Sequence, residues 1–111
     1  MKLPHRELSY VPEAKILRYL LDDAHEDGGP KAAFFKRFGF TRDNWQALAD
    51  ALREHADVNE VVEVEDTRLG TAYVLDGKIR CPDGRLPKIR TVWFVDTGEL
   101  SPRFVTAYPL D

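Results

Sequence analysis

The stretch LPKIRTVWFVDTGELSPRFVTAYP, residues 86–109, decides the fold class of this chain. It contains two runs rich in β-branched and aromatic residues, near 86–95 and 102–109, which flank the turn sequence Asp96-Thr97-Gly98-Glu99. Short turns join antiparallel strands, because a parallel pair needs a crossover of about a dozen residues. The stretch therefore predicts an antiparallel hairpin.

Two more strands are expected upstream of this hairpin, near 60–66 and 71–81. The breaks Thr67–Gly70 and Pro82-Asp83-Gly84 have the composition of turns. Together, the four runs predict a meander sheet.

Before residue 60 the apolar residues recur at helical spacing. Pro12 suits the first turn of a helix that ends near residue 22. Pro30 opens a second helix, which ends at Gly39, and Thr41 suits the N-cap of a third.

These elements predict one domain over residues 1–111, of the α+β class. Two to three helices, in the helical part 12–57, are expected to pack on one face of a four-stranded antiparallel sheet, 60–109. The opposite face of that sheet is where we expect a functional surface.

Composition indicates the cellular compartment in which the protein is expected and the classes of function that are less favoured. The chain has one cysteine, Cys81, and no apolar run near the ~20 residues of a membrane span. We recognise no signal segment, so a reducing cytoplasm is expected. The net charge of −3 does not favour indiscriminate binding of nucleic acid.

The charges are unevenly spread along the chain. Residues 77–95 hold five basic residues and one acid, and Lys78, Arg80 and Arg90 are among the bases. Residues 60–66 hold four acids and no base. The basic segment is compatible with a phosphate-bearing substrate such as RNA, or with an ordinary solvated hairpin.

Neither a metal nor a cofactor is expected. The three histidines, His5, His25 and His55, lie far apart in the sequence without a cysteine or histidine at ligand spacing. His25 lies in a polar, glycine-paired loop before the helix that carries Lys31, and a loop histidine titrates near neutrality. It is either a general acid or base, or a plain surface histidine.

The register of the last two strands is left open by the sequence. A two-residue turn at Thr97-Gly98 would group Thr91 and Trp93 with Thr106 and Tyr108 on one face. A shift of one residue would group Arg90 with Thr106 and Tyr108 instead. Trp93 is either a core residue or a platform on which a base stacks.

Eight runs carry a family resemblance: Leu20–His25, Gly29–Ala32, Phe34-Phe35, Phe38–Phe40, Gly70–Val74, Pro82–Arg85, Arg90–Trp93 and Arg103–Pro109. They resemble an uncharacterised bacterial domain family of unknown function, whose members look like small stand-alone proteins or C-terminal modules of toxins. The order of helices and strands is also similar to the ribonuclease toxins grouped around barnase, RelE and the colicin nucleases.

The resemblance to those toxins implies a metal-independent cleavage of RNA, in which a ribose 2′-hydroxyl attacks the adjacent phosphate. It implies His25 as acid or base, with Lys31 and Arg90 stabilising phosphate charge, and Tyr108 beside them in the catalytic set. Thr91, Trp93, Thr106, Lys78 and Arg80 would contact the substrate. Glu26 and Asp27 depart from the expected pattern, since two acids would repel a phosphate.

Two functional hypotheses follow. The first is a ribonuclease-like toxin, held by a small cognate protein. The second is a non-enzymatic partner-binding module, such as an antitoxin-like or regulatory protein, whose acidic edge strand pairs with another chain.

Overall fold

The computed structural model describes residues 1–110 and consists of three helical segments followed by a four-stranded antiparallel sheet. A short 3-10 turn, η1 (Arg6–Leu8), precedes them. The strands are β1 (Val61–Thr67), β2 (Gly70–Lys78), β3 (Lys88–Asp96) and β4 (Arg103–Pro109), in the order β1-β2-β3-β4. The α+β class and the meander predicted from the sequence are confirmed.

The first helical segment is unusual in its geometry. One turn of α-helix, α1 (Glu13–Lys15), continues into η2 (Ile16–Leu20), a π-helical turn closed by a bond from the Leu21 amide to the Ile16 carbonyl, 2.8 Å. Ile16, Leu20 and Leu21 are fully buried. Arg42 caps the segment by donating to the carbonyl oxygens of Leu17 and Leu21.

The other two helices are α2 (Gly29–Arg37) and α3 (Trp45–Val58). Thr41 does not serve as the N-cap that the sequence predicted, since α3 begins four residues later. Its hydroxyl instead accepts a bond from the Asn44 amide, 3.2 Å, in the turn that precedes the helix.

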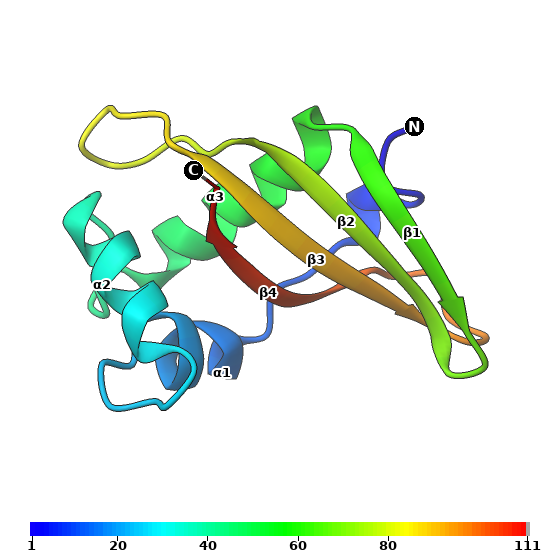
Figure 1. Ribbon diagram of the computed structural model, residues 1–111, viewed down its shortest axis with the longest axis horizontal. Helices are drawn as coiled ribbons and strands as arrows, with labels where there is room; N and C mark the ends of the chain where they lie inside the picture. The colour runs from blue at the N-terminus through cyan, green and yellow to red at the C-terminus, as the bar shows by residue number, and fades with distance from the viewer. Residues whose placement is uncertain (111) are drawn as a thin grey trace.

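The helices lie at two different places around the sheet. Helix α3 lies behind the sheet, whereas α1, η2 and α2 lie beside β4, as Figure 1 shows. The core between these layers is formed by residues from η2, α2, α3 and the strands β2 to β4, including Phe35, Leu52, Leu75, Trp93 and Phe104. Beyond β4, the chain near Tyr10 pairs with Arg103, so the start of that edge is covered.

The connection between β3 and β4 differs from the tight turn expected at Thr97-Gly98. The Glu99 amide bonds to the Asp96 carbonyl, 2.9 Å, but β4 does not begin until Arg103. Val92 pairs with Thr106 and Trp93 with Phe104, which leaves Val105 as an extra residue in a bulge.

The bulge changes which side chains share a face. Between the bulge and the end of β4, Arg90 pairs with Tyr108 and Thr91 with Ala107. Trp93 and Phe104 share the covered face, while Thr106 and Tyr108 lie on the open face with Arg90. Trp93 therefore faces the side of Phe104, as in the first grouping considered from sequence, and Arg90 faces the side of Thr106 and Tyr108, as in the second, although neither of the two turn registers is the observed one.

Candidate functional site

A cluster of polar side chains lies where the edge of β4 meets η2 and α2. Tyr19 Oη lies 2.8 Å from Thr106 Oγ1. Lys31 Nζ donates a hydrogen bond to Tyr19 Oη and a second, of 3.3 Å, to Thr106 Oγ1. The three residues form a closed triangle of hydrogen bonds between elements that lie far apart in the sequence.

Each member of the triangle is placed by apolar neighbours. Tyr19 lies between the buried Ile16 and Leu20 of η2, so its ring is directed along the edge of the core. Lys31 is followed directly by the buried Ala32. Thr106 lies between the bulge residue Val105 and the buried Ala107, which fixes its side chain on the open face.

The electrostatics of the triangle act mainly on Tyr19. Partial burial raises the pKa of its phenol, but the hydrogen bonds from Lys31 and Thr106 and the charges of Lys31 and Lys15 outweigh this effect, and the net pKa is lowered. Both ammonium groups also lie over the ring, at 4.7 Å and 5.4 Å from its centroid. A phenol in this environment loses its proton more readily than an exposed tyrosine.

His25 borders the triangle, but its geometry limits what it can do. Its ring packs edge-on against Tyr19 with 5.1 Å between centroids. Nδ1 accepts hydrogen bonds from the amides of Asp27 and Gly28, at 3.0 and 2.9 Å. The neutral ring therefore carries its proton on Nε2, and a second proton on Nδ1 would break the turn that begins α2.

Arg90 and Tyr108 continue the open face away from the triangle. Arg90 forms a two-pronged ion pair with Asp76, with Nε and one terminal nitrogen 2.7 and 2.8 Å from the carboxylate oxygens. Hydrogen bonding to Asp76 and then to Tyr108 raises the pKa of Arg90, and the same pairing with Arg90 lowers the pKa of Asp76 despite its partial desolvation. Much of the Arg90 charge is thus already matched by a carboxylate.

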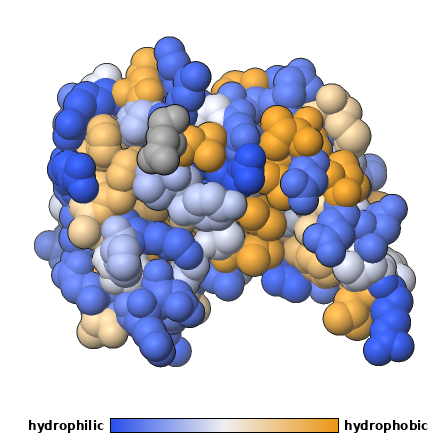
Figure 2. Space-filling view, viewed as in Figure 1, coloured by the Kyte–Doolittle hydropathy of each residue, from blue (hydrophilic) through white to orange (hydrophobic). Residues whose placement is uncertain are grey.

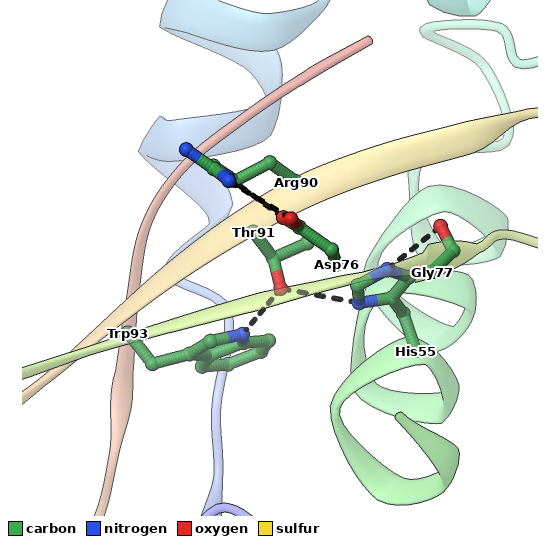
Figure 3. A network of polar contacts seen from close by, with 6 residues as sticks. All are labelled: His55, Asp76, Gly77, Arg90, Thr91 and Trp93. Atoms are coloured by element: carbon green, nitrogen blue, oxygen red, sulfur yellow. Dashed lines mark hydrogen bonds and ion pairs between the residues drawn. The ribbon is translucent and has the colours of Figure 1, made fainter. Parts of the chain in front are cut away.

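Thr91 and Trp93 lie on the other side of the sheet. Figure 3 shows Arg90 and Asp76 on one side of β2 and β3, with Thr91, Trp93 and His55 on the other. Thr91 and Trp93 are fully buried, so neither shares a surface with Thr106. The reason is the bulge at Val105, which the sequence did not reveal.

The buried side chains form a chain of donors and acceptors. Trp93 Nε1 donates to Thr91 Oγ1, 3.0 Å, and the Thr91 hydroxyl lies 3.1 Å from His55 Nδ1. His55 Nε2 lies 3.2 Å from the Gly77 carbonyl, which can only accept, so Nε2 carries the proton and Nδ1 accepts from Thr91. This network links α3 to the sheet and is structural.

Lys78 and Arg80 lie outside the cluster. Lys78 ends β2 opposite Lys88, and Arg80 follows in the loop, where it is exposed and paired with Glu54 of α3 at 3.1 Å. The structure brings some of the predicted site residues together: Lys31 of the catalytic set contacts Thr106 of the substrate-binding set, His25 is adjacent, and Arg90 and Tyr108 lie along the same face.

Tyr19 is the residue that sequence reasoning missed. In the sequence it lies within the run Ile16–Leu21, whose other residues are apolar apart from Arg18. The available signal was a tyrosine inside that run, since a buried tyrosine usually needs a partner for its hydroxyl. Nothing in the local sequence names that partner, Thr106, which lies 87 residues away.

No group of three or more histidine, cysteine or acidic side chains within residues 1–110 is arranged to hold a metal ion. No helix in the same range is long and apolar enough to cross a membrane. Burial raises the pKa of the Cys81 thiol to about 11, which makes it a poor nucleophile.

Comparisons with known proteins give a family match and a solved structure of similar fold. Residues 2–111 match the family described as a domain of unknown function, DUF6883. No curated protein matches. Among solved structures, a chain of the contact-dependent growth inhibition toxin–immunity protein complex from Klebsiella pneumoniae 342 has a similar fold. Its TM-score is 0.75 at 19% identity, and the alignment covers 96% of this chain and 97% of that one.

Proposed function

This chain belongs to the DUF6883 family, and from that premise and the geometry of its site we propose that it is a metal-independent ribonuclease, acting as the toxin of a toxin–immunity pair. The observation that carries the proposal is the hydrogen-bonded triangle of Tyr19, Lys31 and Thr106. The match to a chain of a toxin–immunity complex supports the biological setting, and the chemistry rests on the triangle alone.

The triangle has the groups that RNA cleavage by the ribose 2′-hydroxyl needs. Tyr19, with its lowered pKa, takes the proton from the 2′-hydroxyl as the 2′-oxygen attacks the adjacent phosphorus. The bond from phosphorus to the 5′-oxygen of the next nucleotide breaks, and Lys31 supplies the proton that this oxygen takes up. The products are a 2′,3′-cyclic phosphate and a free 5′-hydroxyl.

Charge stabilisation follows from the same arrangement. The Lys31 ammonium lies beside the position where negative charge develops on the phosphate, and the Thr106 hydroxyl orients the phenol by donating its proton to Tyr19 Oη. Removing one such donor typically costs about 100- to 1,000-fold in kcat.

His25, Arg90 and Tyr108 take supporting roles in this scheme. His25 holds the turn that begins α2, and so helps to place Lys31, because its Nδ1 accepts hydrogen bonds from the amides of Asp27 and Gly28. Arg90, held by Asp76, aligns Tyr108 on the face that the substrate crosses. The proposed partners are therefore RNA as substrate and a small cognate protein as inhibitor.

The test is cleavage of RNA by the purified protein in the presence of a chelator. Wild type is expected to cleave, whereas Lys31→Met, of similar length and without charge, is expected not to.

One feature of the sheet favours the second candidate, a non-enzymatic partner-binding module. On the free edge of the sheet, β1 carries Val62 and Val64 with 54% and 46% of their surface exposed, between acidic side chains. Such an edge can accept a strand from another chain. A protein that forms a stable complex with a cognate partner and cleaves no RNA would be explained by this candidate.

A further inference from the structure

The open face of the sheet holds a second built feature next to the triangle. Phe94 of β3 pairs with Arg103 of β4, and the Arg103 guanidinium carbon lies 5.0 Å from the centroid of the Phe94 ring. Asp96 fixes the guanidinium through Nε at 3.0 Å and a terminal nitrogen at 3.4 Å. An arginine held at a carboxylate and stacked on an aromatic ring presents a flat, oriented surface.

Gly70 shows that the ring of Phe94 lies close over the sheet. A Cβ atom at Gly70 would come within 2.5 Å of Cε2 of Phe94 and 2.3 Å of the Val95 carbonyl oxygen. The φ angle of Gly70, +153°, is also one that other residues rarely adopt. The sequence thus keeps a glycine where the ring needs room.

The pair lies on the same face as the triangle and close to it. Phe94 is two residues along β3 from Val92, which pairs with Thr106. Two residues of an extended strand span about 7 Å. A short length of extended RNA whose scissile phosphate is at Lys31 and Thr106 can therefore reach Phe94 and Arg103.

RNA is not expected to bind this face through a continuous row of basic side chains. Arg90 and Arg103 are each paired with an aspartate of the same face. In the space-filling view, apolar side chains gather in the middle of the face between hydrophilic ones (Figure 2). Stacking of bases, rather than multiple phosphate contacts, is the interaction that such a surface offers to RNA.

We propose that Phe94 and Arg103 form a stacking subsite for one unpaired nucleobase of the RNA substrate, next to the nucleotide that is cleaved. This inference rests on the proposed ribonuclease function. It assigns the stacking surface to the Arg103 guanidinium, which the half-buried ring of Phe94 and the carboxylate of Asp96 hold in place.

Binding of an uncleavable RNA tests the subsite directly. The probe is a short 2′-O-methyl oligoribonucleotide that contains the fluorescent base 2-aminopurine, and its quenching reports stacking. Phe94→Ala and Arg103→Lys are each expected to weaken binding about tenfold, since stacking of one base contributes about 1–3 kcal/mol. Phe94→Tyr keeps an aromatic ring and is expected to bind like wild type.

Arg85 provides a matched control. It stacks on Phe38 at 4.1 Å and pairs with Asp83 at 2.6 Å, in a loop at the far end of α2 from Lys31. Arg85→Lys makes the same chemical change as Arg103→Lys and is expected to leave binding and quenching unchanged. Equal losses in both variants would overturn the subsite, because the effect would then not be specific to this face.

Cleavage assays separate this proposal from the ribonuclease proposal. Phe94→Ala is expected to raise KM with little change in kcat, whereas Lys31→Met lowers kcat and still binds the uncleavable probe. If wild type cleaves RNA and Phe94→Ala binds the probe as tightly as wild type, the subsite is wrong and the ribonuclease stands. If wild type binds the probe through Phe94 but cleaves nothing, the ribonuclease is wrong and the subsite stands. Failure of wild type to bind the probe removes the subsite in every case.

Discussion

Tyr19 Oη and Thr106 Oγ1 lie 2.8 Å apart, although 87 residues separate them in the chain. This contact joins the π-helical turn η2 to the last strand and places Lys31 between them. A tyrosine whose hydroxyl served only to fill a gap in the core would need one neutral partner. Here it has a neutral partner and a cation, and its pKa is lowered as a result. The contact is thus suited to proton transfer as well as to folding.

Replacement of Lys31 should remove activity without unfolding the protein. Lys31→Met is expected to lower kcat for RNA by about 100-fold or more, because the leaving group loses its proton donor and the phosphate loses its neighbouring charge. Lys36→Met is the matched control, since Lys36 lies on the same helix but pairs with Asp23 at 2.7 Å. Single-turnover cleavage of a labelled oligonucleotide measures both, and equal rates in the two variants would contradict the role of Lys31.

The pH dependence of cleavage should follow the phenol of Tyr19. Because its pKa is lowered, the deprotonated fraction increases as pH rises toward that pKa, and the cleavage rate is expected to rise with it. Tyr19→Phe should be slow and should lack this rise. Tyr73→Phe loses a hydroxyl in β2, outside the triangle, and should keep the wild-type profile. A pH profile that Tyr19→Phe leaves unchanged would assign the proton transfer to another group.

Substitution of His25 distinguishes a structural role in the turn before α2 from a role in proton transfer. Asparagine offers an acceptor oxygen to the amides of Asp27 and Gly28, as Nδ1 does in the native turn. His25→Asn is therefore expected to stay within about threefold of wild type, whereas a residue that moves a proton contributes about 100-fold or more. His25→Ala, without an acceptor, should be the slower variant. A loss of about 100-fold in His25→Asn would restore His25 as an acid or base.

The buried His55 should make stability depend on pH. Desolvation lowers its pKa more than the Gly77 carbonyl raises it, so the unfolded chain binds more protons than the folded chain below about pH 6.5. The free energy of unfolding should therefore fall as pH decreases from about 6.5 toward the pKa of the folded state, and the contribution of His55 should be level below that pKa.

His55→Gln isolates this contribution. At about pH 7.5 the variant should be less stable by about 1–3 kcal/mol, because Thr91 and Gly77 lose a well-placed partner. Urea unfolding at about pH 5 should show a smaller difference between variant and wild type. A difference that is independent of pH would mean that His55 titrates alike in both states.

The sequence predicted the elements because their signals are local. Alternation and turn residues define the four strands, and proline and glycine mark the ends of the first two helices. The length of β2 was less accurate, since Ile79 and Cys81 are apolar and buried but lie in the loop after Lys78. Buried loop residues and strand residues have the same composition.

The arrangement of the site could not be predicted in the same way. One extra residue, Val105, reverses the face on which Thr106 and Tyr108 lie relative to Phe104, and no residue type marks a bulge at that position. The sequence therefore left two groupings of side chains open, and the structure combines them in a register that differs from both. Lys31 and Thr106 lie in contact, as the ribonuclease hypothesis requires, whereas the partner that joins them, Tyr19, depends on how η2 packs beside β4.

The most direct test of the central claim is the chemistry of the product ends. Wild-type protein and Lys31→Met are incubated in chelator with one RNA oligonucleotide and with its all-2′-deoxy counterpart, and the products are analysed by mass spectrometry. The account predicts 2′,3′-cyclic phosphate ends from RNA with wild type, and no cleavage either of the deoxy strand or by Lys31→Met. Cleavage of the deoxy strand, equal cleavage by Lys31→Met, or intact RNA after incubation with wild type would contradict it.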